Sequence, residues 1–121
     1  MMWRTLIALM AVLAITYAET YTSQYDGIDP EEFIQNPKIL HANINCILGK
    51  GKCTPAAKEL NLHVEDAVKT GCQKCTEKQK SSARRIIKHI IAHEPKYWEE
   101  LKAKYDPNNE YQKTYEDFLK Q

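Results

Sequence analysis

Four cysteines are the residues whose type and spacing could do chemistry in this chain. Cys46, Cys53, Cys72 and Cys75 form the pattern C-x6-C-x18-C-x2-C, which could be a redox dithiol, a zinc site or a pair of disulfides. A redox C-x-x-C follows a strand, and no strand pattern precedes Cys72. A four-thiolate zinc site takes two close pairs, and the gap between the first two cysteines is long for one. We therefore expect disulfides, for which the sequence alone allows three pairings.

The histidines could bind a metal, but the sequence does not assemble a full ligand set around them. His89 and His93 stand four residues apart on a predicted helix, as metal ligands can. No acidic residue or cysteine lies one turn away to complete the set, and His41 and His63 are isolated. We interpret all four as structural or surface histidines. No nucleophile elbow or glycine-rich phosphate loop is present either, so we expect no metal, no cofactor and no enzyme activity.

Polar and aromatic residues on apolar helix faces suggest a binding function. Gln79 lies four, seven and eleven residues before Ala83, Ile86 and Ile90, so it shares their helical face. It either only closes a capping box with Thr76 or also offers a hydrogen bond to the polar end of a bound apolar molecule. Five large aromatic side chains could either pack in the core or line a pocket with their polar ends facing a ligand. They are Tyr25, Trp98, Tyr105, Tyr111 and Tyr115.

The elements that must position these residues are all predicted to be helices. A capping residue followed by proline begins two of the helices, at Asp29-Pro30 and at Thr54-Pro55. Pro37 and Pro95 begin two more, and Thr76 caps a fifth. A sixth, amphipathic segment covers residues 111–119. Glycines at 49, 51 and 71 are expected to end helices. The apolar stripes are Leu40, Ile44 and Ile47, then Ala57, Leu60, Val64, Ala67 and Val68, then Ala83, Ile86, Ile87, Ile90 and Ile91.

The first 18 residues have the pattern of an export signal. A short segment with Arg4 precedes the apolar run Leu6 to Ile15, and Thr16-Tyr17-Ala18 offers the small residues that signal peptidase needs. The run is about half of the roughly 20 residues that a membrane span requires. We expect cleavage after Ala18, a secreted protein, and one domain over residues 19–121.

The charge balance argues against polyanionic partners. Arg4 is one of the 17 basic residues, so its removal leaves 16 basic against 16 acidic residues. Nucleic acids and anionic membranes recruit proteins through clustered positive charge, which an interspersed neutral balance does not supply. We expect a monomer that binds neither.

Several motifs together resemble those of the insect chemosensory proteins, also called the OS-D-like family. They are Tyr25-Asp26, Gly51-Lys52-Cys53, Lys58-Glu59-Leu60, Cys72-Gln73-Lys74-Cys75-Thr76, Trp98-Glu99-Glu100-Leu101 and Lys104-Tyr105-Asp106-Pro107. The resemblance implies a six-helix globule around a narrow hydrophobic channel that binds long-chain alcohols, esters, acids or other semiochemicals. It also implies that Cys46 pairs with Cys53 and Cys72 with Cys75.

The resemblance also implies which residues line the channel. By position these are Tyr25, Ile44, Leu60, Gln79, Ile87, Ile90, Trp98 and Tyr115, to which the apolar faces add Val64, Ala83 and Ile86. Many relatives have an aromatic residue where this chain has Asn43, so one wall of the channel is expected to be wider or more polar.

The predicted function is a secreted carrier that solubilises a long apolar molecule. The alternative is a secreted regulatory or structural factor that acts through a protein partner. The sequence identifies neither the ligand nor a receptor.

Overall fold

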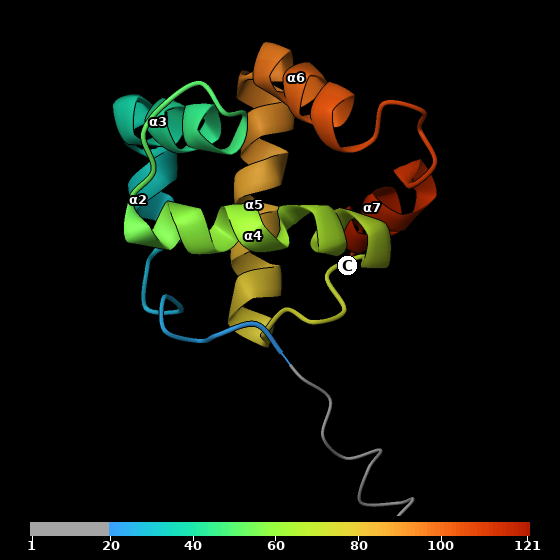
Figure 1. Ribbon diagram of the computed structural model, residues 1–121, viewed down its shortest axis with the longest axis horizontal. Helices are drawn as coiled ribbons and strands as arrows, with labels where there is room; N and C mark the ends of the chain where they lie inside the picture. Colours follow the sequence, from blue (N-terminus) through green and yellow to red (C-terminus); the bar gives the residue numbers. More distant parts are fainter. Residues whose placement is uncertain (1–19) are drawn as a thin grey trace, which may run out of the picture.

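Six helices make up the part of the chain that the computed structural model describes, residues 20–121 (Figure 1). They are α2 (Pro30–Ile34), α3 (Pro37–Ile47), α4 (Pro55–Thr70), α5 (Glu77–His93), α6 (Pro95–Tyr105) and α7 (Gln112–Leu119). Residues 20–121 contain no strand, so the all-helical prediction is confirmed. The predicted signal peptide, residues 1–18, lies outside the described residues.

Helix starts follow the capping residues that the sequence contains. The side chain of Asp29 accepts a hydrogen bond from the Glu31 amide at 3.0 Å, and Thr54 Oγ1 accepts one from the Ala57 amide at 3.1 Å. Each bond satisfies an amide that has no partner inside the helix. Proline follows both capping residues, where its missing N–H costs nothing.

Two glycines end helices by adopting left-handed backbone angles. Gly49 follows α3 with φ +80°, and Gly71 caps α4 with φ +69°. A side chain clashes with its own backbone in this conformation, so glycine is the favoured residue. The turn after Gly71 then leads into α5 within six residues, at Glu77.

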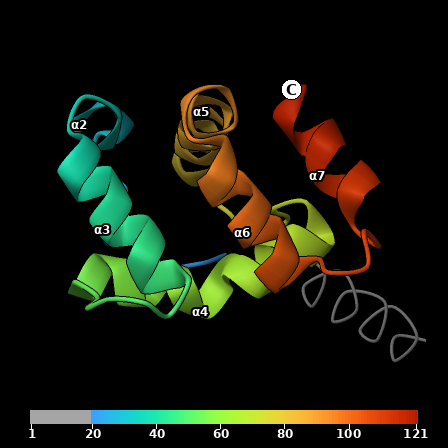
Figure 2. The same ribbon diagram turned by 90° about the horizontal axis from the view of Figure 1, so that it is seen from above.

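The helices are arranged around α5. Figure 1 shows α5 running through the middle of the molecule with α4 crossing it, and Figure 2 shows α3, α6 and α7 standing side by side over α4. α5 packs closely on α2, α6 and α7, and α4 packs closely on α3, α6 and α7, but α4 and α5 are not a closely packed pair. Within residues 20–121, no helix is sufficiently long and apolar to cross a membrane.

Most of the buried apolar residues form two clusters. The first cluster joins α2, α3, α5 and α6 around Leu40, Ile44 and Ile90. The second cluster joins α7, α4, α5 and the turn between α4 and α5 around Cys72, Cys75 and Phe118. The described residues therefore contain two small cores instead of one continuous core.

Both disulfides close short local loops. Cys46 pairs with Cys53 and Cys72 with Cys75, with Cα atoms 5.1 Å apart in each case, as the family resemblance implied. The paired residues are only seven and three positions apart in the sequence. Neither disulfide joins two distant helices.

Side chains of α6 hold the C-terminal end of α3. The Ile47 carbonyl accepts hydrogen bonds from the Tyr105 hydroxyl at 3.2 Å and from the Lys104 ammonium group. Beside them, Lys50 Nζ lies 3.1 Å from Glu100 Oε1. A positive charge at a helix C-terminus is favourable because the last carbonyls carry partial negative charge.

Gly71 provides a test of the helix-ending geometry. Gly71→Ala should lower the free energy of unfolding by about 1–2 kcal/mol because alanine resists a positive φ. The added Cβ would also lie 3.2 Å from Thr114 Cγ2. Urea denaturation of residues 19–121 measures the change. Gly27→Ala is the matched control, since its Cβ would meet nothing within 4 Å, and it should stay within about 0.5 kcal/mol of the parent.

Candidate ligand-binding site

Gln79 holds three parts of the chain together at the start of α5. Its Oε1 accepts a hydrogen bond from the Thr76 amide at 3.0 Å, and Thr76 Oγ1 accepts one from the Gln79 amide at 3.1 Å. These two bonds are the predicted capping box. Gln79 Nε2 also donates to the Thr22 carbonyl at 2.8 Å. One amide hydrogen and one oxygen lone pair are left over, so a contact with a ligand stays a prediction.

The apolar residues of α5 divide between the two clusters. Ile90 is only 4% exposed in the first cluster, and Ile86 packs against that cluster. Ala83 packs against the second cluster. Ile87, between them in sequence, is partly buried. The predicted lining face of α5 therefore spans the region between the two cores.

Trp98 and Tyr115 bring α6 and α7 into contact. Their ring centres lie 5.7 Å apart with the ring planes at 90°, an edge-to-face arrangement that aromatic rings favour. Trp98 also packs against the first cluster. Burial, followed by the nearby carboxylate of Asp106, raises the pKa of the Tyr115 hydroxyl. The hydroxyl is therefore a neutral hydrogen-bond donor at physiological pH.

The other predicted lining residues differ widely in exposure. Ile44 is 3% exposed in the first cluster, whereas Leu60 is 51% exposed on α4. Val64 and Tyr25 are partly buried. Asn43 is also partly buried, and its Nδ2 donates to the Ile39 carbonyl of the same helix at 2.8 Å. The amide of Asn43 is thus used within α3, and its effect on a channel stays a prediction.

Two clefts on the molecule are lined by other residues. One, of about 490 Å³, lies between the C-terminal end of α4 and α7, and includes Thr70, Gly71 and Phe118. The other, of about 440 Å³, lies between α4 and the residues before α2, and includes Tyr21, His63 and Asp66. Neither includes a residue predicted to line the channel, so the position of the channel stays a prediction.

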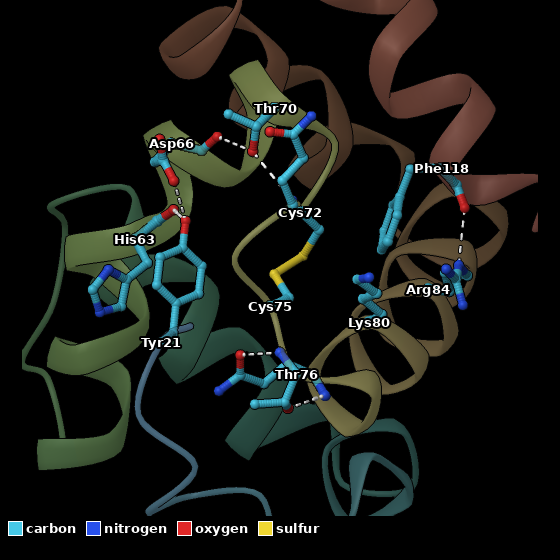
Figure 3. Close-up of a disulfide and its surroundings, with 12 residues drawn as sticks. Tyr21, His63, Asp66, Thr70, Cys72, Cys75, Thr76, Lys80, Arg84 and Phe118 are labelled. Atoms are coloured by element: carbon cyan, nitrogen blue, oxygen red, sulfur yellow. Dashed lines mark hydrogen bonds between the residues drawn. A yellow bond between two sulfur atoms is a disulfide. The ribbon is translucent and has the colours of Figure 1, made fainter. Parts of the chain in front are cut away.

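The second cleft contains a set of contacts that the sequence did not suggest. Tyr21 donates its hydroxyl hydrogen to Asp66 Oδ2 at 2.5 Å, and its ring stacks on His63 with ring centres 4.0 Å apart (Figure 3). The Tyr21 amide donates to the Lys74 carbonyl at 2.8 Å, and Thr76 Oγ1 donates to Asp26 Oδ2 at 2.8 Å. Residues 21–26, here called the N-terminal strap, are thus fixed to α4 and to the Cys72–Cys75 turn.

Sequence reasoning missed the strap because it has no helical or strand periodicity. Its contacts join residues that are 42 to 57 positions apart, and no local motif predicts such pairs. Aromatic residues with unassigned roles were the available signal, and Tyr21 is one of these. Burial and the neighbouring Asp66 carboxylate raise the pKa of Tyr21 well above its usual range. A hydrogen bond from the neutral Tyr21 hydroxyl to the Asp66 carboxylate therefore helps to hold the strap in place.

A family comparison agrees with this arrangement of helices and cysteines. Residues 21–113 match the model of the "Insect pheromone-binding family, A10/OS-D". The chain belongs to the insect A10/OS-D family. The matched range contains both disulfides, helices α2 to α6 and only the first two residues of α7.

Relatives of this A10/OS-D protein come from several insects. It is 44% identical over 118 residues to "Allergen Tha p 1" of Thaumetopoea pityocampa, which covers 91% of this chain and 94% of the relative. It is 36% identical over 109 residues to "Ejaculatory bulb-specific protein 3" of Drosophila melanogaster, covering 90% of this chain and 86% of the relative.

Solved structures show the same fold. A "Chemosensory Protein in Complex with bromo-dodecanol" is 47% identical, with a TM-score of 0.75 over 81% of this chain and 98% of that chain. Antennal chemosensory protein A6 of the moth Mamestra brassicae is also 47% identical, with a TM-score of 0.67 over 83% of this chain and 93% of that chain. This A10/OS-D chain therefore has the six-helix fold of the chemosensory proteins.

Tyr21 predicts how stability depends on pH. Because the folded-state pKa of Tyr21 is raised, its contribution is fully present below the unfolded pKa of about 10 and is lost as pH rises above it. Tyr21→Phe should lower the free energy of unfolding at pH 7 by about 1 kcal/mol through the lost hydrogen bond.

Urea denaturation between pH 7 and pH 11 tests this prediction. The parent should lose stability more steeply above pH 10 than Tyr21→Phe. Tyr25→Phe is the matched control within the strap and should keep the parent's slope. Equal slopes for the parent and Tyr21→Phe would contradict the assignment.

Proposed function

We propose that this A10/OS-D protein is a secreted, non-enzymatic carrier that binds and solubilises long-chain apolar molecules. The proposed ligands are fatty alcohols, acids or esters and other semiochemicals. The binding region is the face of α5 between the two clusters, together with α4, Trp98 and Tyr115. The observation that carries the proposal is the split core described above.

Several apolar residues predicted to line the site are only partly buried. Val64, Ile87 and Trp98 all keep some exposure, although each is apolar and lies on a helix that packs on several others. Partial burial of such side chains leaves free energy to be gained by covering them, at about 25 cal/mol per Å². An apolar guest would supply that cover.

The crossing of α4 over α5 supports the same region. Helices that pack directly bring their axes within about 8–10 Å. α4 is closely packed on α3, α6 and α7, which hold it across α5, but is not closely packed on α5 itself. Predicted lining residues come from both helices, with Val64 on α4 and Ile87 on α5. A long molecule between them would contact both.

A relative with a bound ligand supports the class of guest. The chemosensory protein in complex with bromo-dodecanol shares 47% of its residues with this chain and aligns over 98% of its own length. Twelve-carbon alcohols are therefore the first compounds to test. A carrier of this kind needs no catalytic group, and within residues 20–121 no cluster of three His, Cys, Asp or Glu side chains suits a metal.

Simple energetics predict moderate affinity. Removing a twelve-carbon chain from water contributes at most about 10 kcal/mol at about 0.8 kcal/mol per methylene. Lost freedom of motion removes about 4 kcal/mol or more. The remainder corresponds to a dissociation constant in the micromolar range, and one hydrogen bond changes it by only about 1 kcal/mol. Such a carrier tolerates a range of chain lengths.

Secretion is part of the proposal. It rests on the signal pattern of residues 1–18 and is supported by two disulfides among residues 20–121, since disulfides persist in oxidising compartments.

Val64 tests where the guest lies. Val64→Phe should weaken dodecanol binding at least about tenfold, because the larger ring takes up space between α4 and α5. Leu62→Phe is the matched control on the same helix, where the parent side chain is 74% exposed, and it should stay within about twofold. Displacement of a fluorescent apolar probe by C12 to C18 alcohols and acids measures both. If none of these compounds displaced the probe from the parent below its solubility limit, the carrier hypothesis would be refuted. The alternative, a factor that acts through a protein partner, would then remain.

Trp98 offers an intrinsic signal of binding. The chain has two tryptophans, Trp3 in the predicted signal peptide and Trp98, so the mature protein contains only Trp98. Dodecanol should shift or quench its emission with the same midpoint as probe displacement. Tyr97→Phe, next to it on α6, should leave that response intact. If saturating dodecanol left the emission spectrum of Trp98 unchanged, the placement of Trp98 beside the guest would be contradicted.

A further inference from the structure

His89 and His93 lie together on the C-terminal part of α5. They are four residues apart on one helix, so they share a face, and their ring centres are 4.7 Å apart. His93 is exposed and His89 is partly buried. Neither belongs to the predicted lining of the carrier. The two imidazoles therefore form a pair that solvent can reach.

Such a pair has the donors that late first-row metal ions prefer. Imidazole nitrogen binds Zn²⁺, Ni²⁺ and Cu²⁺, at about 2.0–2.1 Å in the case of Zn²⁺. Two donors on one metal then lie about 3 Å apart, which two rings at this separation can reach by small side-chain rotations. Helical His pairs with this spacing also supply two of the ligands in known zinc sites.

The charges around the pair have both signs, since the exposed Lys88 adjoins His89 and Arg85 lies one turn before it. The last carbonyls of α5 give its C-terminal end a partial negative charge. Arg85, one turn before His89, is paired with Glu31 at 2.8 Å, which reduces its repulsion of a metal ion. Glu94 lies 3.0 Å from His41 Nε2 and is thus directed to α3. Residues 20–121 supply no third His, Cys, Asp or Glu ligand, so solvent would complete the coordination.

Against the sequence-based expectation of no metal, we propose that His89 and His93 form a two-imidazole site for a divalent late first-row metal ion on the surface of α5, separate from the apolar site. Cu²⁺ should bind more tightly than Ni²⁺ or Zn²⁺, because it stands highest in the general order of affinities. The site needs two adjacent coordination positions on the metal. It does not depend on the carrier function.

The probe is the Cu²⁺ complex of iminodiacetate, whose chelator leaves coordination positions free for protein donors. Isothermal titration of untagged residues 19–121 at pH 7.5 measures its affinity. His89→Gln and His93→Gln should each weaken binding of the probe at least about tenfold. Each variant keeps one imidazole, so it loses the gain in affinity that comes from two imidazoles on one helix binding the same ion. Electron paramagnetic resonance should show two imidazole nitrogens on Cu²⁺ in the parent and one in each variant.

His63→Gln is the matched control. His63 also stands four residues from a potential ligand, Glu59, at 2.9 Å, but supplies only one imidazole. It should change the affinity by less than about twofold. Circular dichroism and thermal unfolding confirm that each variant is folded. Equal affinities for the parent, His89→Gln and His93→Gln, or a one-imidazole signal in the parent, would overturn the proposal.

Discussion

Burial of apolar helix faces is the constraint on which this fold depends, because no covalent bond joins distant helices. The disulfides link residues seven and three positions apart, so they stiffen a loop after α3 and the turn before α5. Short cross-linked loops remove little freedom from the unfolded chain compared with long ones. The relative positions of α3, α6 and α7 are therefore set by side-chain packing and by a few polar contacts such as those at the Ile47 carbonyl.

Polar contacts also hold the segment before α2, where Tyr21 packs against the second cluster as well. The N-terminal strap has no secondary structure, and it is held by Tyr21, by the Thr76–Asp26 hydrogen bond and by Gln79. Thr76 and Gln79 serve two purposes, because the same two residues cap α5. A single capping box thus fixes the start of the longest helix and the path of the segment before α2.

Local signals made most of the fold predictable from the sequence. Capping residues, prolines and glycines act within a few residues of one another, so Thr54, Gly71 and Thr76 marked the helix ends correctly. The disulfide pairing did not follow from spacing and came from the family resemblance. The strap could not be foreseen, since Tyr21 and Asp66 are 45 positions apart in the sequence and only the tertiary fold brings them together. The candidate lining residues were partly predictable as apolar stripes, but periodicity assigns Leu60 and Ile44 alike to a buried face.

Among the described helices, only α5 contributes side chains to both clusters, with Ile90 in one and Ala83 packed on the other. These residues are seven positions apart, about 10 Å along the helix. A local opening of one cluster would therefore leave α5 covered by the other. Amide hydrogens in the middle of α5 should consequently exchange with solvent deuterium most slowly, and those of α7 much sooner.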